Sequence, residues 1–126
     1  MYNVLVTGVG SVIGYGIIDG LRKSTVKTRV IGIDIYEDAY GGVLCDKFIK
    51  GVRADADNFI DFINQIIVDN KIDLIFPGIE QDLYKLWANE ENVKTKIVLN
   101  NDLCLNLSAN KLKTFEYLSG FNINLI

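Results

Sequence analysis

The fold is decided by Val4-Leu-Val-Thr-Gly-Val-Gly-Ser-Val-Ile-Gly-Tyr-Gly-Ile-Ile18. Its apolar start, which ends at Thr7, predicts a buried strand, and the apolar residues that recur at helical spacing after it predict a helix. Gly8 and Gly10 stand between the two, and glycine allows a tight turn with close approach of the backbone to a ligand or a strand. Successive N–H groups at such a turn, placed before a helix, form an anion site. The stretch therefore predicts a strand–turn–helix unit that can hold an anion.

The glycines depart from the dinucleotide-binding fingerprint G-x-G-x-x-G, because the third glycine, Gly14, comes one residue late. Asp34 ends the next apolar run, Arg29-Val-Ile-Gly-Ile-Asp34, and lies twenty residues beyond Gly14, where a ribose-binding carboxylate is expected. Two interpretations stay open. Gly8, Gly10 and Asp34 bind a ligand, or the glycines only close a strand–helix corner and Asp34 only ends a strand.

Length and composition limit the class of protein. A chain of 126 residues, 49% of them apolar, predicts one domain with its own core. The net charge of -3 and the absence of a stripe of Lys or Arg argue against nucleic acid or an anionic membrane as partners. No apolar segment approaches the roughly 20 residues that span a bilayer, and no secretory signal begins the chain. We therefore expect a cytoplasmic protein.

Histidine and cysteine usage excludes several chemistries. The sequence contains no histidine, which rules out a Ser-His-Asp or Cys-His catalytic unit and His-ligated zinc within this chain. Cys45 and Cys104 stand far apart without a CxxC pattern, so neither a metal site nor a disulfide is expected. Both cysteines are expected to behave as small apolar side chains.

Strand and helix patterns alternate along the rest of the chain. The expected strands are residues 3–7, 29–34, 47–50, 72–76 and 96–99, and residues 121–126 resemble the start of another. The expected helices lie around residues 13–21, 59–67, 79–87, 103–107 and 109–119, with Ser108 as the N-cap and Gly120 as the C-cap of the last. Residues 35–46 are expected to form a loop. This alternation predicts an α/β, Rossmann-like three-layer domain with a mostly parallel, doubly wound sheet and right-handed crossovers.

Ligands of such sheets bind beyond the carboxyl ends of the strands, near the point where the strand order reverses. That edge collects the Gly8–Gly10 turn, Asp34 and the turn at residues 77–80. Glu80 there has two interpretations. It faces a ligand, or it only places negative charge at a helix N-terminus, where the helix dipole favours it.

Four segments, taken in order, resemble the N-terminal domain of ATP-grasp ligases. They are Val4-Leu-Val-Thr-Gly-Val-Gly-Ser11, Val30-Ile-Gly-Ile-Asp34, Ile72-Asp-Leu-Ile-Phe-Pro-Gly-Ile-Glu-Gln-Asp82 and Asn110-Lys-Leu-Lys-Thr-Phe-Glu-Tyr-Leu118. The sequence most resembles short forms of the carbamoyl-phosphate synthase large subunit and related carboxylate–amine ligases. The resemblance covers essentially all 126 residues and implies a single pre-ATP-grasp domain, residues 1–126, cut off before the ATP-grasp domains.

The resemblance also implies a division of labour. Later domains of these ligases hold ATP and Mg²⁺, and the N-terminal domain forms one wall of the site for a small-molecule carboxylate or amine. The candidate substrate-binding residues here are Gly8, Gly10, Ser11, Asp34 and Glu80. The isolated chain is expected to be inactive, with no catalytic residue, no metal and no tightly bound cofactor. Its expected partners are the remaining ATP-grasp domains and a second copy in a homodimer.

One residue is a candidate for binding nucleotide phosphate. Members of the family carry Asp-Lys at the start of the helix that leads into the ATP-binding part, and the lysine of several members contacts phosphate. The pair reads Asn110-Lys111 here, so the resemblance implies that role for Lys111. The alternative is an exposed lysine in a first helical turn.

Three functions remain open from the sequence. The first is the N-terminal domain of a truncated ligase, and the second is an NAD(P)-binding module of an oxidoreductase or epimerase. Tyr36 and Tyr40 have no lysine four residues on, so the second lacks a catalytic Tyr-x-x-x-Lys pair. The third is a non-enzymatic regulatory domain that binds a small anion at the glycine turn. A native gene product much larger than 14.1 kDa would make Ile126 an artificial boundary and favour the first.

Overall fold

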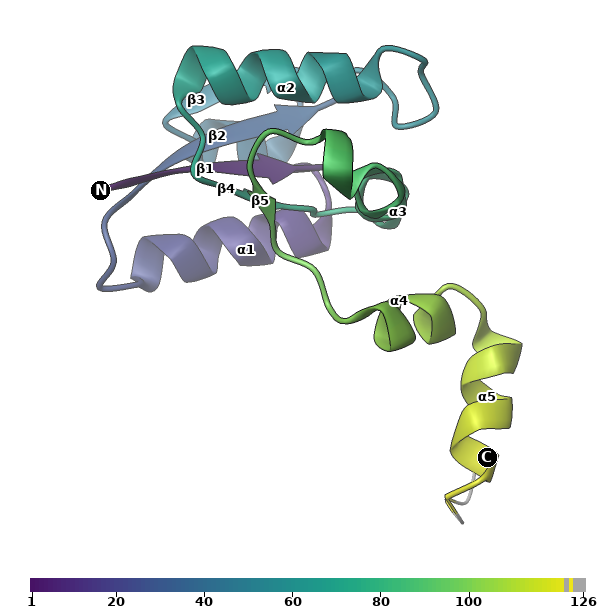
Figure 1. Ribbon diagram of the computed structural model, residues 1–126. Helices are drawn as coiled ribbons and strands as arrows, with labels where there is room; N and C mark the ends of the chain where they lie inside the picture. The colour runs from purple at the N-terminus through teal and green to yellow at the C-terminus, as the bar shows by residue number, and fades with distance from the viewer. Residues whose placement is uncertain (122, 124–126) are drawn as a thin grey trace.

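The computed structural model describes residues 1–121 and 123, and in it five strands form one parallel sheet in the order β3-β2-β1-β4-β5 (Figure 1). The strands are β1 (Tyr2–Thr7), β2 (Thr28–Asp34), β3 (Lys47–Lys50), β4 (Leu74–Phe76) and β5 (Lys96–Ile97). The helices are α1 (Val12–Lys23), α2 (Phe59–Asn70), α3 (Glu80–Ala88), α4 (Asp102–Ser108) and α5 (Lys111–Ser119), with short 3₁₀ helices η1 (Tyr40–Leu44) and η2 (Glu90–Asn92). The order reverses at β1, which confirms the doubly wound Rossmann-like fold.

The central strand β1 supplies side chains to two separate cores, because successive side chains of a strand point to opposite faces. Val4 and Val6 pack with Ile18 of α1 on one face. Leu5 packs on the other face with Phe59, the first residue of α2, in a core that also includes Leu86 of α3. Helices α1 and α2 accordingly lie on opposite sides of the sheet in Figure 1, as the sequence predicted.

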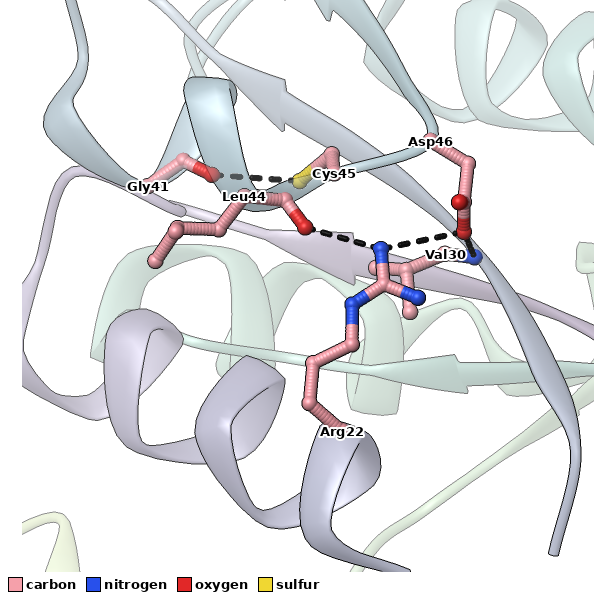
Figure 2. Close-up of polar contacts among 6 residues, drawn as sticks. All are labelled: Arg22, Val30, Gly41, Leu44, Cys45 and Asp46. Carbon is pink, nitrogen blue, oxygen red and sulfur yellow. Dashed lines mark hydrogen bonds and ion pairs between the residues drawn. The ribbon is translucent and has the colours of Figure 1, made fainter.

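A group of polar contacts joins α1 to the segment between η1 and β3 (Figure 2). The Arg22 guanidinium donates to the Leu44 carbonyl at 2.8 Å and to the Asp46 carboxylate at 3.1 Å. Asp46 also accepts the Val30 N–H at 2.7 Å. Burial raises the pKa of Asp46, but the Val30 N–H and Arg22 lower it by more, so this carboxyl titrates below its ordinary range. Asp46 thereby links α1 to the start of β2.

The two cysteines differ in their surroundings. Cys45 is half-buried, and its thiol donates to the Gly41 carbonyl at 3.3 Å. Burial raises the pKa of the Cys45 thiol to about 11, so it stays protonated and packs as a small side chain, as expected. Cys104 is exposed on α4, whose one buried residue is Leu105, so the expectation that both cysteines pack as apolar side chains was wrong for it.

Several elements differ from the sequence prediction. β4 begins at Leu74, after the predicted start at residue 72, because the Ile72 N–H still donates to the Ile67 carbonyl of α2, and β5 has only two residues. The expected loop 35–46 contains η1. Ser108 does not cap the last helix, because it is still helical in α4 and donates to the Leu105 carbonyl. Asn110, with extended backbone, caps α5 instead by accepting two N–H groups.

The C-terminal helices extend away from the sheet (Figure 1). α4 is anchored by its buried Leu105 and by a 3.0 Å hydrogen bond from the Trp87 indole to Asp102. α5 buries none of its residues. Gly120 follows α5 at its C-cap, as expected, in a right-handed conformation, and the strand expected at 121–126 lies outside the described residues apart from 121 and 123. No helix of the described chain is both long and apolar enough to cross a bilayer.

Candidate functional site

A cavity of about 590 Å³ opens at the carboxyl edge of the sheet, where the fold predicts a ligand. Its wall is formed by the ends of β1 and β2, the segment after β3 and one side of α3. The residues on it are Gly8, Ile33, Asp34, Ile35, Gly51, Val52, Arg53, Ala54, Asp55, Ile79, Gln81, Asp82, Tyr84, Lys85 and Ala88. Gly8 and Asp34 are the two candidate substrate residues that the structure brings to this cavity.

The N–H groups of the glycine turn donate hydrogen bonds to oxygen atoms of the protein itself. The Gly10 N–H donates to the Asp34 carboxylate at 2.8 Å, the Val9 N–H to the Ile33 carbonyl at 3.2 Å and the Ser11 N–H to the Gly8 carbonyl at 2.9 Å. Gly8 takes a positive φ of 58° to make this turn. An anion at the turn would therefore have to displace Asp34 from Gly10.

Asp34 has both carboxylate oxygens engaged by backbone donors. One oxygen accepts the Gly10 N–H at 2.8 Å, and the other accepts the Tyr36 N–H at 3.0 Å. Asp34 thus holds the glycine turn against the loop that follows β2.

Ser11 is the N-cap of α1 and a link to the turn between β4 and α3. Its hydroxyl accepts the Gly14 N–H at 2.8 Å and donates to the Gly78 carbonyl at 2.8 Å. The Gly78 N–H in turn donates to the Thr7 hydroxyl at 3.3 Å. Ser11 therefore joins the turn after β1 to the turn after β4. It does not line the cavity.

The acidic start of α3 presents Asp82 to the cavity, whereas Glu80 is exposed and is not part of the cavity wall. Only 6% of Asp82 is exposed. Residues two positions apart on a helix point in nearly opposite directions. The Glu80 carboxylate therefore faces outward and the Asp82 carboxylate faces inward. The sequence reasoning missed Asp82, although it falls at helical spacing with Ile79 and Leu86, which gave a signal for a core-facing position.

Asp82 is a buried carboxyl that forms no ion pair in the described part of the chain. Burial is the main cause that raises the pKa of Asp82, and the negative charge of Asp34 raises it further, while a hydrogen bond from the Thr7 hydroxyl acts in the opposite direction. No ion pair to Asp82 exists within residues 1–121 and 123. The folded protein therefore holds a proton on Asp82 more tightly than the unfolded chain does.

Asp82→Asn is expected to stabilise the domain, because it removes the cost of burying an unpaired charge. A raised pKa in the folded state means that wild-type stability falls as the pH rises from 3.8, the ordinary value for this carboxyl, through the raised value. The gain in the free energy of unfolding of Asp82→Asn should be absent below pH 3.8 and largest well above that pH. Urea denaturation across this range measures it.

Glu80→Gln is the matched control, because it removes one carboxylate from an exposed position of the same helical turn. It should change the free energy of unfolding by no more than about 1 kcal/mol, the usual contribution of a charge at a helix terminus. A gain for Asp82→Asn that does not vary with pH would contradict the prediction.

Two cationic side chains, Arg53 and Lys85, also lie on the cavity wall. Arg53 forms a two-point ion pair with Asp55, at 3.0 and 3.2 Å, with both side chains largely exposed. Lys85 of α3 is half-buried, and no carboxylate in the described part of the chain lies within ion-pair distance of its ammonium. The described residues also contain no group of three acidic or cysteine side chains placed to hold a metal ion.

Lys111 lies far from this cavity wall in the fold. It is the first residue of α5, is exposed, and does not line the cavity. The structure thus places the phosphate candidate on a helix that extends from the domain, and it keeps Lys111 apart from Gly8 and Asp34.

Comparison with known families gives one match over most of the chain. A family model described as "PylC-like, N-terminal domain" matches residues 4–99. No curated protein sequence matches the chain.

Solved structures with the same fold include larger enzymes. N5-carboxyaminoimidazole synthetase from Staphylococcus aureus, solved with ADP, aligns with a TM-score of 0.71 over 99% of this chain and 31% of that one, at 19% identity. Glycinamide-RNase-transformylase T from Mycobacterium tuberculosis aligns with a TM-score of 0.60 over 87% of this chain and 35% of that one, at 18% identity. The chain thus spans about a third of either protein, and at these identities both show the fold alone.

A short chain dehydrogenase family protein from Francisella tularensis shares less of the fold. It aligns with a TM-score of 0.51 over 80% of this chain and 51% of that one, at 26% identity.

Proposed function

Since the chain belongs to the PylC-like N-terminal domain family, which is an N-terminal domain of ATP-grasp ligases, we propose that it is the substrate-site domain of an ATP-dependent carboxylate–amine ligase. Within that class we propose the kind related to carbamoyl-phosphate synthase. The domain would form one wall of the site for a small-molecule carboxylate or amine. Residues 1–126 would then form one domain that does not catalyse the reaction alone.

The observation that carries this proposal is the hydrogen bond between the Gly10 N–H and Asp34. Dinucleotide-binding domains use the glycine turn for pyrophosphate and the carboxylate after the second strand for ribose. Both groups are bound to each other here, and the cavity lies beside them against α3. This arrangement supports a substrate wall and disfavours a nicotinamide site.

The chemistry of the proposed ligase would be shared between domains. ATP and Mg²⁺, held by further domains, would activate a carboxylate as an acyl phosphate for attack by an amine. The residues of this chain would bind and orient a substrate in the cavity and exclude water from its apolar wall. Lys111, on the exposed helix α5, remains our candidate for contact with nucleotide phosphate.

The chain is expected to show negligible binding of NAD(H) and NADP(H) in titration calorimetry, because Asp34 occupies the amide that the pyrophosphate would need. Asp34→Ala frees that amide, yet it also removes the carboxylate at the end of β2 that would accept the ribose hydroxyls, so binding should stay negligible. Micromolar dinucleotide binding by the wild type, lost in Asp34→Ala, would establish the nicotinamide alternative instead.

A further inference from the structure

The cavity beside α3 combines an apolar wall with three carboxyl groups, and of these Asp55 is paired with Arg53. Its apolar side chains are Ile33, Ile35, Val52, Ala54, Ile79 and Ala88. Asp34 and Asp82 lie close enough for the charge of one to raise the pKa of the other. A volume of about 590 Å³ is ample for a small molecule, so the cavity has the composition of a binding site with a polar end.

Asp82 is the unusual member of this wall. Only 6% of Asp82 is exposed, and it lies on the same face of α3 as the buried core residue Leu86. The Thr7 hydroxyl acts to lower the pKa of Asp82, and no cation in the described chain forms an ion pair with it. A buried carboxyl without a counter-ion is costly, and a cation supplied by a ligand would remove that cost.

We propose that the Asp34–Asp82 end of the cavity binds the ammonium group of a primary amine with an apolar body, and that Asp82 determines specificity for that group. The proposal rests on the ligase function above, because it assigns the amine, and not the carboxylate, to this wall. An ammonium group can donate to Asp82 at the same time as it meets the charge of Asp34. The apolar side chains would then cover the alkyl part of the amine.

The remaining charged and titratable groups on the wall favour one orientation of such a ligand. They are Arg53, Asp55, Tyr84 and Lys85. Arg53 and Asp55 neutralise each other in their ion pair. Lys85 would repel an ammonium group, so the ligand's positive end should turn toward Asp82. Wherever Asp82 is protonated, its proton would leave to solvent when the ammonium binds.

The experiment uses propylammonium as the probe, followed by ¹H–¹⁵N spectra and by calorimetry at constant ionic strength. Wild-type protein is expected to bind it with shifts at residues of the cavity wall, more tightly as the pH rises through the titration of Asp82. Asp82→Asn should weaken binding about tenfold or more, as expected when a charge-assisted hydrogen bond is lost, and should remove the pH dependence. Glu80→Gln, in the same turn of α3 but off the wall, should bind as the wild type does.

Three outcomes would overturn the proposal. They are no binding of propylammonium, equal binding to Asp82→Asn and wild type, and equal binding of 1-propanol, which has the same apolar body without the charge. The ¹H–¹⁵N spectrum of Asp82→Asn shows directly whether the variant is folded, and Asp82→Glu, which keeps the charge, should retain part of the affinity. A negative result with propylammonium would overturn the amine site alone. The proposed ligase function is tested separately, by the calorimetry with NAD(H) and NADP(H), and only dinucleotide binding there would contradict it.

Discussion

Gly14→Ala is expected to destabilise the domain by about 3 kcal/mol or more, because α1 would have to move away from β1. A Cβ atom on Gly14 would lie 2.3 Å from the Gly8 carbonyl oxygen and 2.9 Å from the Val9 Cα. Both are backbone atoms of the glycine turn, so no side chain can rotate to relieve the overlap. Urea denaturation followed by circular dichroism measures the loss.

Gly20→Ala provides the matched control within the same helix. A Cβ atom there meets nothing within 4 Å, and Gly20 lies in the interior of α1. Alanine is the better helix former, so this substitution should stabilise the protein by about 0.5–1 kcal/mol. Equal effects of the two substitutions would show that α1 does not pack on the glycine turn as closely as the structure has it.

Phe59→Ala is expected to cost about 3–5 kcal/mol, the range for removing a large aromatic side chain from a core. Phe59 is 0% exposed and packs with Leu5 and Ile63 between α2 and the sheet. The side chain is the largest that this core buries completely. The free energy of unfolding from denaturant titration tests this value.

Phe115→Ala makes the same chemical change on α5, where 48% of the side chain is exposed and no residue is buried. It should alter the stability by no more than about 0.5 kcal/mol. A large loss from Phe115→Ala would mean that α5 packs on the domain more closely than the structure indicates.

The layered fold could be predicted from the sequence because the relevant signals are local. The run to Thr7, the glycines after it and the stripe that begins at Phe59 each show the period of the element that forms. Strand length could not be predicted in the same way. Residues 98–99 are as apolar as a strand requires, yet β5 ends at Ile97, and the Val98 N–H makes one last hydrogen bond to the Ile75 carbonyl of β4.

The site was harder to predict than the fold, because its chemistry depends on contacts between distant segments. The sequence put Asp34 at the correct strand end, but its bond to Gly10 crosses 24 positions of the chain. Glu80 and Asp82 both suit a helix N-terminus, and only the packing of α3 separates an exposed carboxylate from a buried one. Asn110 and Ser108 are likewise both good capping residues, and the extended backbone at Asn110 decides between them.

The two edges of the sheet have a consequence for the behaviour of the chain before it is fully folded. An exposed edge strand offers unpaired N–H and C=O groups to another chain, and parallel sheets form slowly because their contacts are distant in sequence. Here one edge, β5, has two residues, and the other, β3, has four with a lysine at each end. Short edges and lysine charges both oppose strand addition. The domain is therefore built to resist aggregation through its sheet edges while it folds.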